Sequence, residues 1–163
     1  MSRLREALAQ RILVLDGAMG TMIQAAGLGA QDFGGVQYEG CNEYLNLTRP
    51  DVIRNVHAAY LAAGADLIST NTFGCAPYVL GEYALAERAH EITLAAARLA
   101  REVAGERFVV GAMGPSTRSI SVTRNVTFDQ VRDAYALQAA ALIAGGVDAL
   151  LLETVQDLSL IHI

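Results

Sequence analysis

The feature that most constrains the fold is a short pattern that occurs twice. Residues 62–68 (Ala-Ala-Gly-Ala-Asp-Leu-Ile) and 144–150 (Ala-Gly-Gly-Val-Asp-Ala-Leu) each join the end of a helical segment, a glycine turn, an aspartate and the start of an apolar run. The two aspartates, Asp66 and Asp148, are 82 residues apart, a distance that fits two units of equal length. A repeated passage from helix into buried strand predicts a chain built of βα units.

Four short apolar runs are expected to be buried strands: Ile12–Leu15, Leu67–Ser69, Phe108–Val110 and Ala149–Leu152. The segments between them have helical periodicity. One stripe recurs at steps of three and four residues through Leu85, Ala89, Ile92, Ala96, Leu99 and Val103. Buried strands that alternate with helices form a parallel sheet, so the predicted class is α/β.

Residues with special backbone preferences mark the helix ends. Pro50 is expected in a first helical turn, where a missing N–H costs nothing, and Thr127 with Gln130 has the spacing of a capping box. A left-handed residue at the end of a helix favours glycine, which has no Cβ. The glycines that end periodic segments just before a strand are Gly64, Gly105, Gly145 and Gly146.

Composition excludes several classes of protein. The 163 residues are 53% hydrophobic and 18% charged, which is typical of one globular domain. A net charge of -5 has the wrong sign for binding nucleic acid. Residues 134–152 are too interrupted by polar residues and glycine for a membrane span, and residues 1–10 do not resemble a signal peptide. A cytoplasmic protein with no nucleic-acid or membrane partner is expected.

Length leaves two architectures open. A (β/α)8 barrel typically needs about 250 residues, whereas this chain has room for about four βα units. It is therefore either a small open sheet or the first half of a TIM barrel, a partial domain over residues 1–163 that stops after the fourth strand. A half barrel has two open edges, so we expect the isolated chain to be marginally stable or to self-associate.

Two carboxylates are expected at one mouth of the sheet. The carboxyl ends of parallel strands carry the chemistry of α/β folds. The first predicted strand ends at Asp16 and the fourth at Glu153. This pair could hold a cation such as the ammonium of an amino acid. Alternatively, Asp16 could cap a helix and Glu153 could pair with an arginine.

Other residues at the strand ends support weaker hypotheses. Asn71 and Thr72 could bind a ligand or satisfy loop backbone. Ser116 lacks the setting of a nucleophile elbow. The turn with Gly17 and Gly20 could receive a carboxylate or phosphate on its N–H groups, although an ordinary tight turn fits equally well. Three residues are expected to be packing or surface residues: His57, His90 and Cys75.

Several of these stretches, taken in order, resemble the homocysteine S-methyltransferase family, and most closely its N-terminal homocysteine-binding module in cobalamin-dependent methionine synthase. The matching stretches are 16–21, 40–45 (Gly-Cys-Asn-Glu-Tyr-Leu), 48–51, 63–66, 70–73 (Thr-Asn-Thr-Phe), 114–116 and 153–154. The resemblance extends to about Leu158. Residues 40–51 are more similar to methionine synthase than to betaine-homocysteine methyltransferase.

The resemblance implies a (β/α)8 barrel that binds homocysteine and zinc and presents the thiolate to a methyl donor, which yields methionine. A free thiol has a pKa of about 8.5, and zinc coordination removes its proton. The resemblance assigns the ammonium to Asp16 and Glu153. Backbone groups around Gly17, Ala18 and Met19 would receive the carboxylate. The same pocket would also be lined by Asn71, Thr72 and Gly114.

The family's zinc ligands are cysteines at the ends of later strands, and neither Cys41 nor Cys75 matches one of them. Catalytic zinc needs three protein ligands, so this chain is expected to supply no metal ligand and no catalytic residue. Methylcobalamin and folate would be bound by downstream domains of the intact protein. We expect the chain alone to be inactive.

Three alternatives stay open. Betaine or S-methylmethionine could replace the corrinoid as the methyl donor. The chain could be a non-catalytic fragment with at most weak amino-acid binding. A phosphate-binding α/β protein is also possible, resting only on the glycines at positions 17 and 20.

Overall fold

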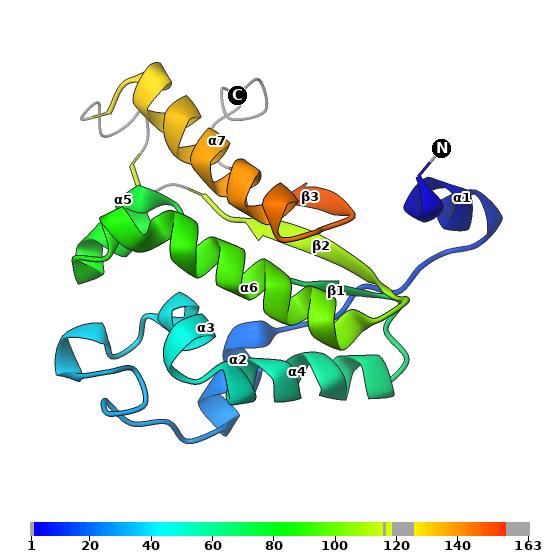
Figure 1. Cartoon of the computed structure of the whole chain (residues 1–163), viewed down its shortest axis with the longest axis horizontal. Helices are drawn as coiled ribbons and strands as arrows, with labels where there is room; N and C mark the ends of the chain where they lie inside the picture. The colour runs from blue at the N-terminus through cyan, green and yellow to red at the C-terminus, as the bar shows by residue number, and fades with distance from the viewer. Residues whose placement is uncertain (1, 116, 119–125, 156–163) are drawn as a thin grey trace.

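The computed structural model describes residues 2–115, 117–118 and 126–155 and shows a parallel sheet with helices packed on one face (Figure 1). The strands are β1 (Leu67–Ser69), β2 (Phe108–Met113) and β3 (Ala149–Leu152), in the sheet order β1-β2-β3. Both pairings are parallel. The α/β class predicted from the sequence is confirmed, and β1 and β3 have the predicted bounds.

Long helices connect the strands and cover one face of the sheet, whereas α1 lies at the end where the strands begin (Figure 1). The α-helices are α1 (Arg3–Gln10), α2 (Met19–Ala25), α3 (Leu45–Thr48), α4 (Pro50–Ala62), α5 (Pro77–Leu80), α6 (Ala89–Ala104) and α7 (Phe128–Ala144). Single 3-10 turns are η1 (Val36–Tyr38), η2 (Asn42–Tyr44), η3 (Gly81–Tyr83) and η4 (Ala86–Arg88). The stripe expected from Leu85 onward therefore becomes α-helical only at Ala89, because η4 precedes it.

Side chains of the strands alternate between two apolar layers, as the pleat of a sheet requires. Ile68 and Val109 pack against Ala100 and Ala104 of α6. Leu67 and Val110 face the opposite side, where they meet Leu4 of α1. The covered face holds the helices, and the other face leads towards the cavity described below.

The first predicted strand, Ile12–Leu15, is wrong as an extended strand. Leu15 forms only an isolated parallel bridge with Leu67. The amides of Asp66 and Leu67 both donate to the Val14 carbonyl, at 2.8 and 3.1 Å, so one acceptor takes two donors and the regular ladder stops. Ile12 is 89% exposed, which leaves this end of the segment without packing partners among the described residues.

The third predicted strand is longer than expected, because Gly111–Met113 continue the pairing with β3. Gly111 interrupts the apolar run in the sequence, yet it belongs to the strand for a packing reason. A Cβ at this position would lie 2.8 Å from Cδ1 of Leu142 on α7. Glycine lets the helix approach the sheet closely at this point.

The predicted helix ends are confirmed in detail. Pro50 begins α4, and the Thr127–Gln130 capping box forms both of its reciprocal bonds. Gly64, Gly105 and Gly146 have positive φ values of 104°, 53° and 89°. Gly145, in contrast, is right-handed at -80°. The reason for a glycine at this position is packing, because a Cβ there would lie 2.3 Å from the Cβ of Ala97 on α6.

The two aspartates of the repeat have the same role where the strands begin. Asp66 Oδ2 accepts a hydrogen bond of 3.0 Å from the Val14 amide, and Asp148 Oδ2 accepts one of 2.8 Å from the Val109 amide. Each carboxylate thus joins its own strand to the preceding segment. The aspartate of the repeated sequence therefore links two successive units by a hydrogen bond from its side chain to the backbone.

Arginines neutralise the negative charge of both aspartates. Asp66 takes two bonds from Arg11, at 2.6 and 2.7 Å, and one of 2.9 Å from Arg107. Asp148 takes one bond of 3.1 Å from Arg101. Hydrogen bonds from Arg11 and the backbone hold the pKa of Asp66 far below its usual range. We call this end of the sheet the N-terminal edge.

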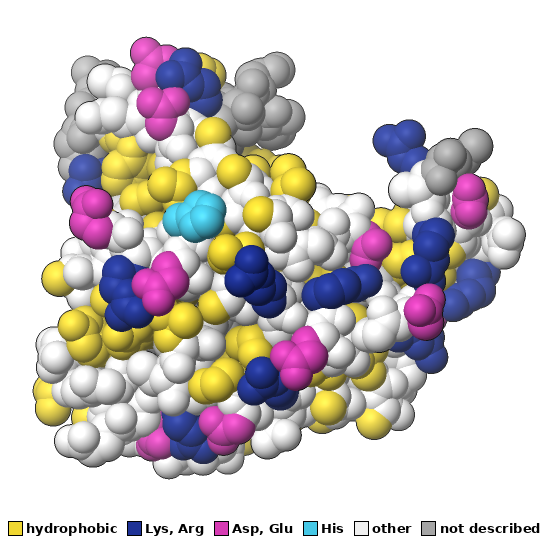
Figure 2. All heavy atoms as spheres, in the orientation of Figure 1, with side chains coloured by type: hydrophobic (Ala, Val, Ile, Leu, Met, Phe, Trp, Pro, Cys, Tyr) yellow, Lys and Arg dark blue, Asp and Glu magenta, His cyan; other side chains and the backbone are white. Residues whose placement is uncertain are grey.

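The outer surface has mixed charge. On the face that Figure 2 shows, basic and acidic side chains are interspersed rather than gathered by sign. Pairs such as Arg54–Glu102 and Arg88–Glu91 are typical of it. No helix within the described ranges is long and apolar enough to cross a membrane.

Candidate functional site

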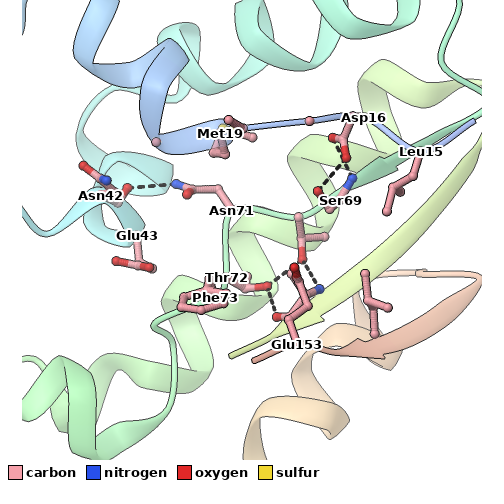
Figure 3. Close-up of a pocket in the computed structure, with 16 residues that line it drawn as sticks. Leu15, Asp16, Met19, Asn42, Glu43, Ser69, Asn71, Thr72, Phe73 and Glu153 are labelled. Atoms are coloured by element: carbon pink, nitrogen blue, oxygen red, sulfur yellow. Dashed lines mark hydrogen bonds between the residues drawn. The ribbon is translucent and has the colours of Figure 1, made fainter. Parts of the chain in front are cut away.

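A cavity of about 470 Å³ opens at the carboxyl ends of the strands (Figure 3). Its walls come from the turn after Leu15, from η2, from the loop after β1 and from β2 and β3. Of the eight residues predicted to bind substrate, all except Gly114 line this cavity. The topology therefore brings together residues that are far apart in the sequence.

Asp16 is fixed by the last residue of β1. Its Oδ2 accepts a 2.8 Å bond from the Ser69 amide, and its Oδ1 accepts a 2.7 Å bond from the Ser69 hydroxyl. Burial raises the pKa of Asp16, and the two bonds from Ser69 oppose that rise. The capping alternative does not apply, because the N-cap of α2 is Ala18 and makes no side-chain cap bond.

Glu153 reaches the same cavity from the end of β3. Its amide donates to the Met113 carbonyl at 3.0 Å, which holds the residue at the strand end. Burial raises the pKa of the Glu153 carboxyl, and the negative charge of Asp16 raises it further. The two carboxylates are therefore close enough to repel each other.

This pair of anions lacks a basic partner in the site. The cavity lining contains no Lys, Arg or His, and none of the ion pairs among the described residues involves Asp16 or Glu153. Two like charges around an empty space favour a cationic ligand, because its charge would relieve their repulsion. The arginine alternative for Glu153 is not seen in the described part of the chain.

Backbone donors lie beside the carboxylates. The N–H groups of Gly17 and Ala18 line the cavity and donate to no group in the described part of the chain. Tyr60 of α4 supports this turn, because its hydroxyl donates to the Ala18 carbonyl at 3.3 Å. A Cβ at Gly17 would lie 3.2 Å from that hydroxyl, which explains the preference for a small residue there. Met19 completes this wall as the first residue of α2.

Asn71 and Thr72 line the cavity, but their side chains fasten the loop. Asn71 Nδ2 donates to the Asn42 carbonyl at 2.8 Å and to Asn46 Oδ1 at 3.1 Å. The Thr72 hydroxyl donates to the Ala112 carbonyl at 2.6 Å. Their donor groups are thus already occupied by protein acceptors.

Gly114 lies behind the loop rather than in the lining. Its amide donates to the Phe73 carbonyl at 3.0 Å, and a Cβ would lie 2.5 Å from that oxygen. The glycine therefore permits Phe73 to cross closely over the end of β2. Its predicted place in the pocket wall is taken by the Phe73 ring.

Sequence reasoning did not assign several lining residues to the site, and the three that bear most on its chemistry and shape are Ser69, Glu43 and Phe73. Ser69 could have been found, because it is two residues after Leu67 and so lies on the same face of the strand, which points away from the helices. Glu43 and Phe73 lie in the recognised stretches 40–45 and 70–73. No spacing rule places those loops beside each other before the fold is known.

Both cysteines, and the two histidines in the described part of the chain, lie outside the cavity. Cys41 and Cys75 are buried in an apolar cluster with Leu80 and Leu85, and burial raises the pKa of Cys41 to about 11. Burial lowers the pKa of His57 to about 4, and the ring is fully enclosed, in agreement with a packing role. His90 is exposed. Ser116 lies outside the described residues.

Zinc is the metal that the resemblance implies. The side chains that could ligate it decide whether the described residues fit this metal. Within the described ranges, no three His, Cys, Asp or Glu side chains come together in a way that could hold a metal. The two thiols are held in their protonated form by burial, which disfavours coordination. The described residues therefore do not fit zinc, and no chemical step is assigned to a metal here.

Comparison with known proteins agrees with the geometry. The homocysteine S-methyltransferase profile matches residues 13–163. The chain belongs to the homocysteine S-methyltransferase family. It is 47% identical over 162 residues to methionine synthase of Mycobacterium leprae and 46% identical to that of Mycobacterium tuberculosis. In each case the match covers 95% of this chain and 13% of the relative, so the chain spans only a small part of their length.

Solved structures of the family show the same fold. The oxidised form of the homocysteine methyltransferase MmuM from Escherichia coli is 25% identical, with a TM-score of 0.76 over 96% of this chain and 57% of that one. The metallated form is 24% identical, with a TM-score of 0.77 over 96% and 58%. The arrangement of strands and helices described above is thus that of a homocysteine methyltransferase.

Proposed function

We propose that this chain forms the amino-acid half of a homocysteine site in a methionine synthase. The observation that carries the proposal is the pair Asp16 and Glu153, two carboxylates that share one cavity with no basic residue in its lining. Family membership supplies the substrate class. The first residues matched by the family profile include Asp16, and the match continues past Glu153.

The substrate would bind with its charged end towards the first and fourth units. The ammonium would lie between Asp16 and Glu153, where its positive charge offsets their repulsion. The substrate carboxylate would accept hydrogen bonds from the free amides around Gly17, Ala18 and Met19. Asn71 and Thr72 would shape the wall without giving up their own hydrogen bonds.

The thiol end would then point away from these residues and towards the open side of the cavity. In the family, zinc activates the thiol and a corrinoid or another donor supplies the methyl group. This chain's residues bind and orient the amino acid, and they take no part in the methyl transfer itself. The folate and cobalamin domains of the intact protein, and a cytoplasmic location, belong to the same proposal.

The wider architecture follows from the same comparison. We place the segment from Ile12 to Asp16 and the three strands as the first four units of a (β/α)8 barrel. The parallel order and the sequential neighbours support this arrangement. The domain assignment over residues 1–163 as part of one barrel is included in the proposal.

The direct test compares L-homocysteine with 4-mercaptobutanoic acid, which lacks only the ammonium. Isothermal titration with the full-length gene product should show loss of most of the affinity for the second ligand, because nothing then neutralises the two carboxylates. Equal affinity for both ligands would reject the ammonium site. Butyric acid serves as a control for binding through the carboxylate alone.

The methyl donor needs a separate experiment. Methionine formation by the full-length gene product is measured with methylcobalamin, betaine or S-methylmethionine supplied in turn. The resemblance of residues 40–51 to cobalamin-dependent methionine synthase favours the corrinoid. Turnover with betaine or S-methylmethionine alone would instead support one of the two alternative donors.

A further inference from the structure

The loop 71–74, which follows β1, forms one wall of the cavity, and each of its residues makes a backbone hydrogen bond to another part of the protein. Each of its three first carbonyl groups accepts a hydrogen bond from a different part of the fold. The carbonyls of Asn71, Thr72 and Phe73 accept from Asn46 Nδ2, Gln138 Nε2 and the Gly114 amide, at 2.9, 2.7 and 3.0 Å. The loop therefore has little freedom left once these bonds form.

The last residue of the loop is held differently. The Gly74 amide donates to Glu43 Oε1 at 2.8 Å. Glu43 lies in η2 and lines the cavity itself, so this bond joins two walls of the pocket. In Figure 3, Glu43 lies on the side of the pocket away from Asp16 and Glu153.

Burial of the Glu43 carboxyl at this position is unfavourable in free energy. No arginine, lysine or histidine pairs with its carboxyl in the described part of the chain. Burial raises its pKa, and the bond from Gly74 opposes that rise. Burying a carboxyl without a cation costs free energy unless hydrogen bonds compensate. The bond to the loop is such a compensation.

Gly74 is matched to this contact. Its φ is not positive, so backbone strain does not explain the glycine. A Cβ at this position would instead lie 2.7 Å from Glu43 Oε1. A side chain at position 74 would therefore displace the Glu43 carboxyl from its present bond with the amide. Two sequence positions in separate loops thus depend on each other.

The loop also carries Phe73, whose ring is 44% exposed at the cavity wall. Phe73 belongs to none of the apolar clusters formed by the described residues. Its place is set by the backbone on both sides, through Gly114 at its own carbonyl and Glu43 at the next amide. Releasing the second bond would let the ring move relative to the carboxylate pair.

We infer that Glu43 is a positioning residue, which fixes the loop 71–74 as a wall of the pocket by accepting the Gly74 N–H bond. This inference rests on the proposed homocysteine site for its effect on binding. The hydrogen bond, rather than the negative charge, is what the position requires. A direct contact between Glu43 and substrate is not needed.

Two conservative variants separate the bond from the charge. Glu43→Gln keeps a side chain of the same length with an acceptor oxygen, but loses the charge. Glu43→Asp keeps the charge, but is one methylene shorter and withdraws the carboxyl from the Gly74 amide. Exposed Glu39, in the same region and with no side-chain hydrogen bond among the described residues, gives the matched controls Glu39→Gln and Glu39→Asp.

Both readouts use the full-length gene product. Hydrogen–deuterium exchange of a peptide over residues 70–76 should be as slow in Glu43→Gln as in the unchanged protein, and clearly faster in Glu43→Asp. Homocysteine affinity should stay within about twofold for Glu43→Gln and fall about tenfold for Glu43→Asp, the effect of losing one hydrogen bond to a buried group. The Glu39 variants should change neither readout.

Several results would overturn the inference. Unchanged exchange in Glu43→Asp would mean that the bond does not hold the loop. Faster exchange in Glu43→Asp with unchanged affinity would mean that the loop does not position substrate. Loss of affinity in Glu43→Gln with normal exchange would make the charge the essential feature. If the unchanged protein binds no homocysteine, the proposed function fails, while the exchange data still decide whether Glu43 holds the loop.

Discussion

The two edges of the sheet treat their carboxylates in opposite ways. At the N-terminal edge, Asp66 is surrounded by Arg11 and Arg107, and these bonds lower its pKa. At the carboxyl edge, Asp16 and Glu153 face each other across a cavity, and burial raises the pKa of both. The first arrangement is satisfied within the protein, and for the second we propose that the ammonium of the substrate supplies the positive charge.

The difference separates stability from function within one small sheet. In parallel α/β folds, residues at the strand starts chiefly hold the structure, and residues at the strand ends bind ligands. Here the same chemical group is found in two different surroundings. At one edge it is held by arginines and backbone amides, and at the other it lies between a serine and the cavity, where we propose that it binds the substrate.

The largest expected effect comes from removing charge at the carboxyl edge. Asp16→Asn and Glu153→Gln should each weaken homocysteine binding by about 2–3 kcal/mol, or roughly 30- to 150-fold, because each loses a bond to the ammonium. Stability should be unchanged or slightly higher, since repulsion between the two carboxylates is relieved. Isothermal titration and thermal unfolding measure the two effects. Exposed Glu87→Gln is the control, and normal binding by both site variants would end the proposal.

The next effect reverses the pattern at the N-terminal edge. Asp66→Ala should lower Tm by about 5 °C or more, because several hydrogen bonds to one carboxylate are lost together. Asp148→Ala should cost less, since this aspartate binds a single arginine and the Val109 amide. Homocysteine affinity of the folded protein should be retained in both variants. A larger loss of Tm in Asp148→Ala would contradict the comparison.

The smallest effect is a difference in pH dependence. The raised pKa of Asp16 gives stability that is present below its unfolded pKa and is lost as the pH rises through the folded value. The lowered pKa of Asp66 gives stability that is present above its unfolded pKa and is lost as the pH falls towards the folded value. Between about pH 4 and 7, the Tm of Asp16→Asn should therefore gain on the unchanged protein as the pH rises.

The control for this experiment is a variant at the opposite edge. Between about pH 4 and 7 the deficit in Tm of Asp66→Ala should stay nearly constant, and below about pH 4 it should shrink as the pH falls, because the unchanged protein then loses the contribution of its carboxylate. Parallel Tm curves for all three proteins would show that the surroundings of these aspartates do not differ as described. Thermal unfolding followed by circular dichroism suffices for the measurement.

Much of this fold could be predicted because its signals are local. The apolar runs gave β1 and β3 their correct bounds, and the capping box at Thr127 gave the start of α7. The prediction of the first strand was wrong because strand pairing depends on neighbouring segments. The Val14 carbonyl accepts hydrogen bonds from two amides, and the regular ladder does not continue there. The extra length of β2 was missed because Gly111 reads as a strand end, whereas its role is to admit Leu142.

The site was predictable to the extent that topology determines it. Glu153 follows β3, and Asp16 follows the residue that forms a parallel bridge with β1, so the parallel order brings them to one edge. Glu43 and Phe73 could not be placed, because loops between helices and strands have no periodicity to reveal their contacts. The resemblance assigned Gly114 to the lining, but the adjacent loop covers it. The roles of the lining residues in binding stay predictions.

The hydrogen bonds of the loop 71–74 have a kinetic consequence. Three of its carbonyls and the Gly74 amide are bonded to other parts of the protein, so much of the entropy of ordering this wall is lost during folding rather than during binding. A ligand that enters such a pocket meets a surface already in its final form. Association should then be a single step whose rate rises in proportion to ligand concentration, without the plateau that a closing loop would impose.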